Sequence, residues 1–248
     1  MLTRRALLAA FALPKARQDS ILKEAALRAL AYTRELPDFI CTETIRRSDN
    51  VRGSGWRLKD VLEVQVGISA RREYYKLLTR NGSPTTLSYR QVGGALTEGE
   101  FGSLLAEIFR PGAATFRRKR EMKLAGRGVE VFTYEVPPDK ATYRLEYGYR
   151  SGEPQTTRVG HKGEVWIDHE TSRILRVDQT AIIPKWFPLK VSKTTLDFGW
   201  TEIGGQQWLL PRQSSSIMGS QEILTKNEVA FRDYRRFSAE SSIAFEEP

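Results

Sequence analysis

Two histidines are the side chains in this sequence with the most versatile chemistry. His161 and His169 flank the segment KGEVWID, and Asp168, His169 and Glu170 follow one another directly. A site built from both histidines with Glu164 or Asp168 would offer the imidazole and carboxylate ligands that zinc accepts. Successive side chains in a turn diverge, however, so we expect solvated turn residues here and no metal site.

The motifs of nucleophilic and metal-assisted catalysis are missing from the sequence. It contains no G-x-S-x-G elbow and no H-E-x-x-H, and Cys41 has no histidine near it in sequence. The glycines between residues 93 and 102 lack the Lys-Ser/Thr pair of a phosphate-binding loop. We therefore predict no catalytic residue, no cofactor and no metal, and a protein that is not an enzyme. A hydrolase with an unfamiliar site that uses His161 or His169 stays as a minor alternative.

The chain is basic, with 39 Lys and Arg against 30 Asp and Glu and a net charge of +9. Only Arg117–Arg120 forms a basic run, which favours solvated strand faces over a nucleic-acid groove. Basic and aromatic residues interleave at 71–76 and 232–237, as they do in proteins that bind single strands. We interpret both stretches as strand ends and predict no nucleic-acid partner. The positive charge is still suited to an anionic component of the cell envelope.

The first residues, MLTRRALLAAFALPKA, have the features of an export signal. Arg4 and Arg5 stand just before an apolar run, as in the twin-arginine motif, and Ala10-Phe11-Ala12 is of the A-x-A type that signal peptidase accepts. We predict a twin-arginine-like export signal over residues 1–16. Because the apolar run is short, an ordinary cytosolic N-terminus is the alternative.

Residues 17–248 are predicted to form one domain in the periplasm or outside the cell, since no linker or charge block divides them. The single cysteine, Cys41, allows no intrachain disulfide and lies too far from the leader to be a lipid-attachment site. No other apolar segment approaches the roughly 20 residues of a transmembrane helix. We therefore expect a soluble protein that does not span the membrane.

One segment in the middle of the chain has the pattern of an amphipathic helix. Thr97 and Glu100 have the spacing of a capping box, and Pro111 would end the helix. Between them, apolar residues recur at helical spacing: Phe101, Leu104, Leu105, Ile108 and Phe109. We predict a helix over residues 97–110 that is either a short core helix or a lid over a cavity. A second helix is predicted over residues 21–36, before Pro37.

Elsewhere, alternation of apolar and polar residues predicts long strands. The predicted strands are 58–68, 71–80, 115–124, 129–136, 141–149, 161–167, 174–177, 190–201, 207–218 and 221–234. A turn at 168–173 would place Ile167 opposite Ile174 on one face, and Trp166 opposite Leu175 on the other. Both faces of this hairpin are partly apolar, so we expect a helix, a ligand or a partner to cover the second face.

Together these elements predict an α+β protein: a large curved antiparallel sheet, a half-barrel of about ten or eleven strands, with the N-terminal and mid-chain helices packed on it. The order of elements and the segment GEVWIDHETSRILRV resemble the Lol-type superfamily of periplasmic lipoprotein carriers. That resemblance implies a curved half-barrel whose helices close a hydrophobic cavity. LPDFICTETIRR, GGALTEGEFGSLLAEIF, WIDHETSRILRV and NEVAFRDYRRFSA also resemble a family of exported bacterial proteins of unknown function, which brings no activity.

The leading hypothesis is a binding protein that holds an apolar or lipid-like ligand, such as an acyl chain, in the concave face. We predict that the ligand meets a wall of apolar and tyrosine side chains: Leu105, Tyr143, Tyr147 and Trp166. The alternative is a structural or interaction module of the cell envelope with a filled core and a cationic docking surface. An open apolar cavity beneath residues 97–110 would favour the first hypothesis.

Overall fold

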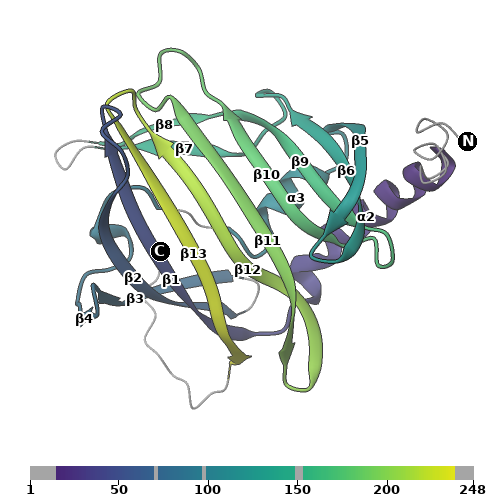
Figure 1. The fold of residues 1–248 in the computed structure, drawn as a ribbon, viewed down its shortest axis with the longest axis horizontal. Coiled ribbons are helices and arrows are strands. Elements are labelled where there is room, and N and C mark those ends of the chain that lie inside the picture. Colours follow the sequence, from purple (N-terminus) through teal and green to yellow (C-terminus); the bar gives the residue numbers. More distant parts are fainter. Residues whose placement is uncertain (1–14, 70–71, 97–98, 149–152, 238–248) are drawn as a thin grey trace, which may run out of the picture.

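The computed structural model describes residues 15–69, 72–96, 99–148 and 153–237, and it contains one large antiparallel sheet (Figure 1). The elements in chain order are α2 (Lys15–Glu35), β1 (Phe39–Val51), β2 (Arg57–Ser69), β3 (Arg72–Arg80), β4 (Ser83–Pro84), the 3-10 turn η1 (Arg90–Val92), α3 (Ser103–Phe109), β5 (Thr115–Leu124), β6 (Arg127–Val136), β7 (Arg144–Tyr147), β8 (Gln155–Arg158), β9 (Gly160–Asp168), β10 (Ile174–Ile182), β11 (Val191–Ile203), β12 (Gln206–Gly219) and β13 (Ile223–Arg236).

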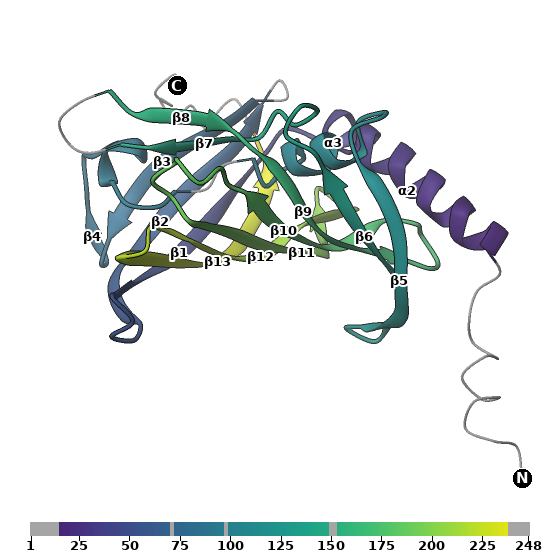
Figure 2. The same cartoon turned by 90° about the horizontal axis from the view of Figure 1, so that it is seen from above.

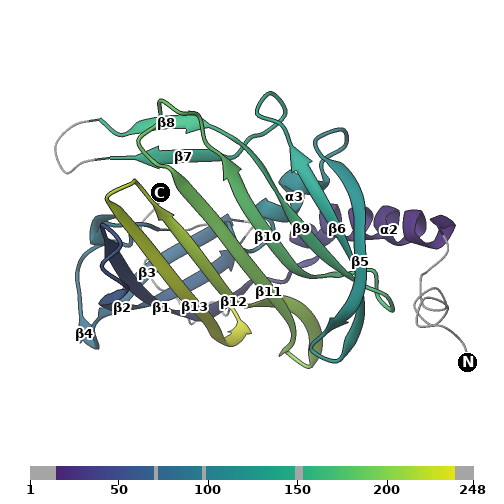
Figure 3. The same ribbon diagram turned by 45° about the horizontal axis from the view of Figure 1, so that its top comes forward.

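The main sheet has 11 strands in the order β4-β3-β2-β1-β13-β12-β11-β10-β9-β6-β5. Its two edge strands, β4 and β5, do not pair with each other, so the sheet stays open. Figures 2 and 3 show that it is curved, with α3 and the small β7–β8 sheet lying across its concave side. These features confirm the predicted α+β half-barrel with two helices packed on one sheet.

Three hairpins have two-residue turns in which both residues have positive φ. The turns are Asn81–Gly82 (53° and 76°), Ala125–Gly126 (48° and 83°) and Gly204–Gly205 (59° and 80°). Turns of this kind match the right-handed twist of the strands that they join, and glycine adopts the second position without strain. Local sequence therefore directs three of the antiparallel connections.

The first helix, α2, begins at Lys15 and ends at Glu35, so the helix predicted over residues 21–36 is present and longer than expected. Its small residues Ala25 and Ala29 are buried, and it contacts α3 and β9. None of the helices in the described part of the chain is both long and apolar enough to cross a membrane. Residues 1–14 lie outside the described residues, so the export signal over 1–16 stays a prediction.

The mid-chain helix, α3, is shorter than predicted, because it begins at Ser103 and not at Thr97. Its N-cap is Gly102, at a φ of 134°, with no capping side chain. A Cβ atom on Gly102 would overlap Thr33 Oγ1 of α2, so close helix packing requires glycine there. The predicted start of the helix is therefore wrong, while Thr97, the predicted cap, lies outside the described residues.

The hairpin of β9 and β10 confirms one predicted cross-strand pair and corrects the other. Ile167 opposes Ile174 as expected. A bulge between Ile174 and Arg176 then places Arg176, and not Leu175, opposite Trp166. The Arg176 guanidinium lies 5.7 Å from the centre of the Trp166 ring and covers it. An arginine side chain thus shields apolar surface that was expected to need a helix, a ligand or a partner.

Candidate functional site: the concave face of the sheet

Two contacts of α3 identify the concave face. The ring of Phe109 stacks on that of Phe116 in β5, with 5.2 Å between centroids, and the Glu107 carboxylate lies 3.7 Å from His161 Nε2 in β9. Side chains alternate between the two faces of a strand, and directly opposite residues share a face. The register therefore assigns every strand residue to the concave or the convex face.

A row of apolar side chains crosses the concave face from β2 to β6. Each member is directly opposite the next, and only Ser214 interrupts the row: Leu62, Ile45, Val229, Ser214, Leu196, Val177, Val165 and Phe132. We call this the apolar row. Its apolar members and the α3 residues Leu105, Ile108 and Phe109 belong to one buried hydrophobic cluster. The underside of α3 is thus part of the main core.

The segment that leads into α3 fills part of the concave face with an aromatic ring. Phe101 is buried, and its centroid lies 5.4 Å from that of Phe39, 5.7 Å from that of Phe231 and 6.5 Å from that of Tyr234. Such edge-to-face contacts stabilise by about 0.5–1.5 kcal/mol each beyond area burial. At this end of the sheet the chain's own side chains occupy the space that a ligand would need.

A second row runs beside the apolar row, two residues further along each strand, and it is polar. Its members are again directly opposite one another: Asp60, Arg47, Asn227, Ser216, Thr194, Gln179, Gly163 and Tyr134. We call this the polar row. Thr194 is half-buried and the other polar side chains are buried. The concave face is therefore divided into an apolar and a polar part.

The polar row begins at a buried ion pair. Arg47, which is 0% exposed, donates to both oxygens of Asp60 at 2.6 and 2.7 Å, and also to the Gly93 carbonyl. Arg80 adds a third bond to Asp60, at 2.9 Å. Burial alone would raise the pKa of the Asp60 carboxyl, but the hydrogen bonds and charges of the two arginines outweigh it and hold the pKa below its usual value. Both charges are thus matched inside the fold.

The segment between η1 and α3 lies over this end of the polar row. Asn227 Nδ2 donates to the Ala95 carbonyl at 2.9 Å, two residues beyond the Gly93 carbonyl that accepts from Arg47. On β11, two residues from Thr194 of the polar row, the Ser192 hydroxyl lies 3.2 Å from that of Tyr143, which joins the segment before β7 to the sheet. The chain therefore contacts the polar side of the concave face both before α3 and before β7.

His161 is buried inside β9, which corrects the expectation of a solvated turn residue. Its Nδ1 lies 3.3 Å from the Tyr134 hydroxyl, and Glu107 accepts a hydrogen bond from the Thr142 backbone at 2.6 Å. Burial lowers the pKa of His161, and Glu107 only partly opposes this. For Glu107, burial raises the pKa, but the hydrogen bonds from Thr142 and the charge of Arg110 outweigh burial and hold the pKa below its usual value. A neutral His161 beside an ionised Glu107 connects α3 to the sheet.

The other residues of the predicted metal group do not gather around His161. Glu164 lies an odd number of residues from His161 on β9, so its side chain is on the convex face. Asp168 binds Arg127 at 2.7 and 2.9 Å, and His169 lies in the turn that follows. Among the described residues, no three His, Cys, Asp or Glu side chains are placed to hold a metal ion.

Carboxylates gather where the segment before α3 meets the sheet. Glu43 on β1 is 3% exposed, and its Oε1 atom is buried without a hydrogen-bond partner. Burial, and then the charges of Glu100 and Glu73, raise the pKa of the Glu43 carboxyl well above its usual value. Glu73 accepts from the Gly99 backbone N–H at 3.1 Å. The protonated form of Glu43 is therefore favoured over a wider pH range than that of an exposed glutamate.

The structure distributes the four predicted wall residues over three places. Leu105 is on α3 and packs in the main core, and Tyr143, which precedes β7, has its ring edge-on to that of His161 at 5.9 Å. Tyr147 packs with Phe187 and Leu189 in a second, smaller cluster, to which Tyr143 also belongs. Trp166 lies an odd number of residues from His161 on β9 and is on the convex face. Only Leu105 and Tyr143 are on the concave side near α3.

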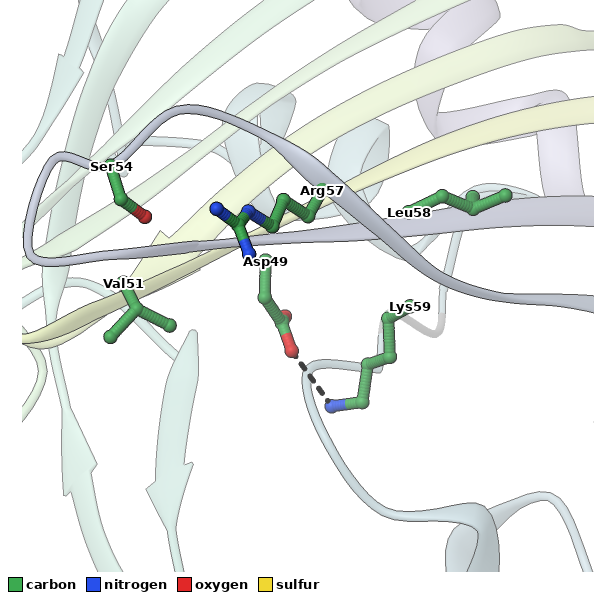
Figure 4. A pocket seen from close by; sticks show the side chains of 6 residues that line it. All are labelled: Asp49, Val51, Ser54, Arg57, Leu58 and Lys59. Atoms are coloured by element: carbon green, nitrogen blue, oxygen red, sulfur yellow. Dashed lines mark ion pairs between the residues drawn. The ribbon is translucent and has the colours of Figure 1, made fainter.

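A pocket of about 350 Å³ opens at the tip of the β1–β2 hairpin (Figure 4). Its lining is mixed: Asp49, Val51, Ser54, Arg57, Leu58 and Lys59. Lys59 and Asp49 point toward each other and form an ion pair at 3.3 Å, and Thr225 donates to Asp49 at 2.8 Å. Because Asp49 follows Arg47 by two residues on β1, this pocket lies beyond the charged end of the polar row.

Comparison with known proteins gave matches in structure only. No family model matches the chain, and no curated protein matches its sequence. A LolA superfamily protein from Nitrosomonas europaea is 14% identical over 89% of this chain and 93% of its own, with a TM-score of 0.36. A DUF1329 family protein from Desulfovibrio piger is 12% identical over 92% of this chain and 96% of its own, with a TM-score of 0.43.

A third solved structure is a domain from Vibrio parahaemolyticus named for outer-membrane lipoprotein sorting. It is 14% identical over 89% of this chain and 92% of its own, with a TM-score of 0.39. Two of the three solved structures are thus named for the LolA superfamily or for lipoprotein sorting.

Proposed function

We propose that this chain is an exported, non-enzymatic binding protein that holds an apolar, lipid-like ligand on the concave face of its open sheet. The supporting observation is the position of α3, which lies across the concave side and turns Leu105, Ile108 and Phe109 toward it. An acyl chain can replace these side chains when α3 moves away, because both are apolar and of similar thickness. In this function α3 is the cover of the site.

Two features of α3 suit a cover. The helix has only 7 residues, so its stability comes from packing and not from its own hydrogen bonds. Gly99 and Gly102, which precede it, have φ values of 94° and 134° that other residues rarely adopt. A short helix that follows two such residues can shift without breaking a regular element.

The test is to purify the full chain from a Gram-negative host and to identify any copurified lipid by native mass spectrometry and organic extraction. Binding of a dansyl-labelled undecanoic acid would be measured in parallel. We expect saturable binding that Leu105→Arg weakens and that Leu27→Arg, at an exposed position of α2, leaves unchanged. Absence of both copurified lipid and saturable binding would refute the proposal.

The aromatic packing of Phe101 favours a second candidate, an envelope interaction module with a filled core. Its ring contacts occupy one end of the concave face, and the net charge of +9 would attract an anionic envelope component. This candidate predicts capture of an anionic partner from an envelope extract that weakens as salt rises from about 0.05 to 0.5 M. Capture that does not depend on salt, together with bound lipid, would favour the first candidate.

A further inference from the structure

The middle of the polar row contains a buried acceptor that the fold leaves unused. Asn227 is 1% exposed, and while its Nδ2 donates to the Ala95 carbonyl, its Oδ1 is buried without a hydrogen-bond partner. Buried polar atoms in native proteins are nearly always paired, and an unpaired one costs about 1–3 kcal/mol. Ser216, Thr194 and Gln179 follow Asn227 in the polar row, each directly opposite the next, and they present hydroxyl and amide groups on the same face.

The charge of this region limits the chemistry of what can bind. The charged residues at the β2 end, Arg47 and Asp60, are paired with each other through two hydrogen bonds, Arg80 also binds Asp60, and the four residues that follow in the row are uncharged. An anionic group such as a phosphate diester has no donor to offer to Asn227 Oδ1. A hydroxyl group both donates and accepts, so it can serve the Asn227 oxygen and the neighbouring hydroxyls together.

The spacing between the polar row and the apolar row suits one ligand that has both a polar and an apolar part. On β10, Gln179 of the polar row and Val177 of the apolar row are two residues apart, and on β11 the same holds for Thr194 and Leu196. Two residues along a strand cover about 6.6–6.8 Å. That distance is close to the separation between a polar head and the first carbons of an acyl chain.

We propose that Asn227, Ser216, Thr194 and Gln179 form a subsite for an uncharged, hydroxyl-bearing group. In the ligand of the proposed function, on which this part rests, the group is the head of a lipid such as an acylglycerol, and the chain extends over the apolar row. A free polyol or sugar presents the same chemistry without the chain.

The experiment uses calorimetric titration of the full chain with 1-decanoylglycerol, with methyl decanoate and with free glycerol. The two esters share one acyl chain, and the glycerol ester adds two carbons that each bear a hydroxyl. We expect the wild type to prefer 1-decanoylglycerol by about tenfold, as two neutral hydrogen bonds would give. The double variant Ser216→Ala with Thr194→Val should lose this preference and bind methyl decanoate as before. Ser215→Ala, an exposed residue one position along β12, should keep it.

Each outcome bears on the subsite separately from the proposed function. Equal binding of both esters by the wild type, or a preference that survives in the double variant, would overturn the subsite and leave lipid binding intact. Binding of glycerol without either ester would support the subsite and refute lipid binding. If none of the three compounds binds to protein with a native circular dichroism spectrum, both proposals fail.

Discussion

Replacement of Phe101 by alanine tests whether the segment before α3 is part of the core or a loosely held cover. The side chain is 1% exposed and contacts the rings of Phe39, Phe231 and Tyr234. Phe→Ala substitutions in well-packed cores cost about 3–5 kcal/mol, and three ring contacts place this site toward the upper part of that range. We therefore expect Phe101→Ala to lower the free energy of unfolding by about 4 kcal/mol.

The assay is urea unfolding at pH 7, followed by far-ultraviolet circular dichroism and evaluated by linear extrapolation. Leu27→Ala is the control, because Leu27 is 58% exposed on α2 and its loss should change the free energy of unfolding by less than about 0.5 kcal/mol. A loss of less than about 1 kcal/mol for Phe101→Ala would refute the reasoning. It would mean that the Phe101 ring is readily released from the sheet and that the cover opens easily.

Two further predictions concern the same region. Gly102→Ala should destabilise the protein by more than about 2 kcal/mol in urea unfolding, because the added Cβ would overlap Thr33 Oγ1. Gly112→Ala is the control: Gly112 has a φ of 71° and nothing within 4 Å of its Cβ position, so this change should cost only about 1 kcal/mol. Equal losses for the two variants would contradict the role of close packing. Glu43→Gln should flatten the pH dependence of stability. Because the pKa of Glu43 is raised in the folded state, its contribution to the free energy of unfolding is complete below the unfolded pKa of about 4.3. That contribution is lost as pH rises toward the folded pKa, by up to about 1.4 kcal/mol per pH unit. Unfolding measured from pH 4 to 8 checks this, and identical slopes for the wild type and the variant would show that Glu43 is not the group responsible.

Sequence alone determines the elements of this fold because their signals are local. The strand predicted over 58–68 is present as β2, and the glycine-containing turns Asn81–Gly82 and Gly204–Gly205 join neighbouring strands. The helix over 21–36 is likewise present in α2. Each of these patterns depends on residues a few positions apart, so the surrounding fold had little effect on it.

The start of α3 and the pairing of Trp166 depended on tertiary structure. Thr97 and Glu100 have capping-box spacing, but the helix begins at Ser103, directly after Gly102, whose close approach to α2 leaves no room for a Cβ atom. One bulge in β10 was enough to replace Leu175 with Arg176 opposite Trp166. Bulges shift register by one residue and exchange the faces of side chains, and nothing in the local alternation marks this one.

The polar row was also decided by tertiary structure alone. Asn227, Ser216, Thr194 and Gln179 come from four strands, and each lies in a run of three or four consecutive polar residues: 225–228, 213–216, 192–195 and 178–180. A single strand indicates that every second residue shares a face, but not which residues of other strands lie beside them. That alignment follows from the register of 11 strands and the curvature that turns one face inward, and these long-range pairings are invisible in any local stretch of sequence.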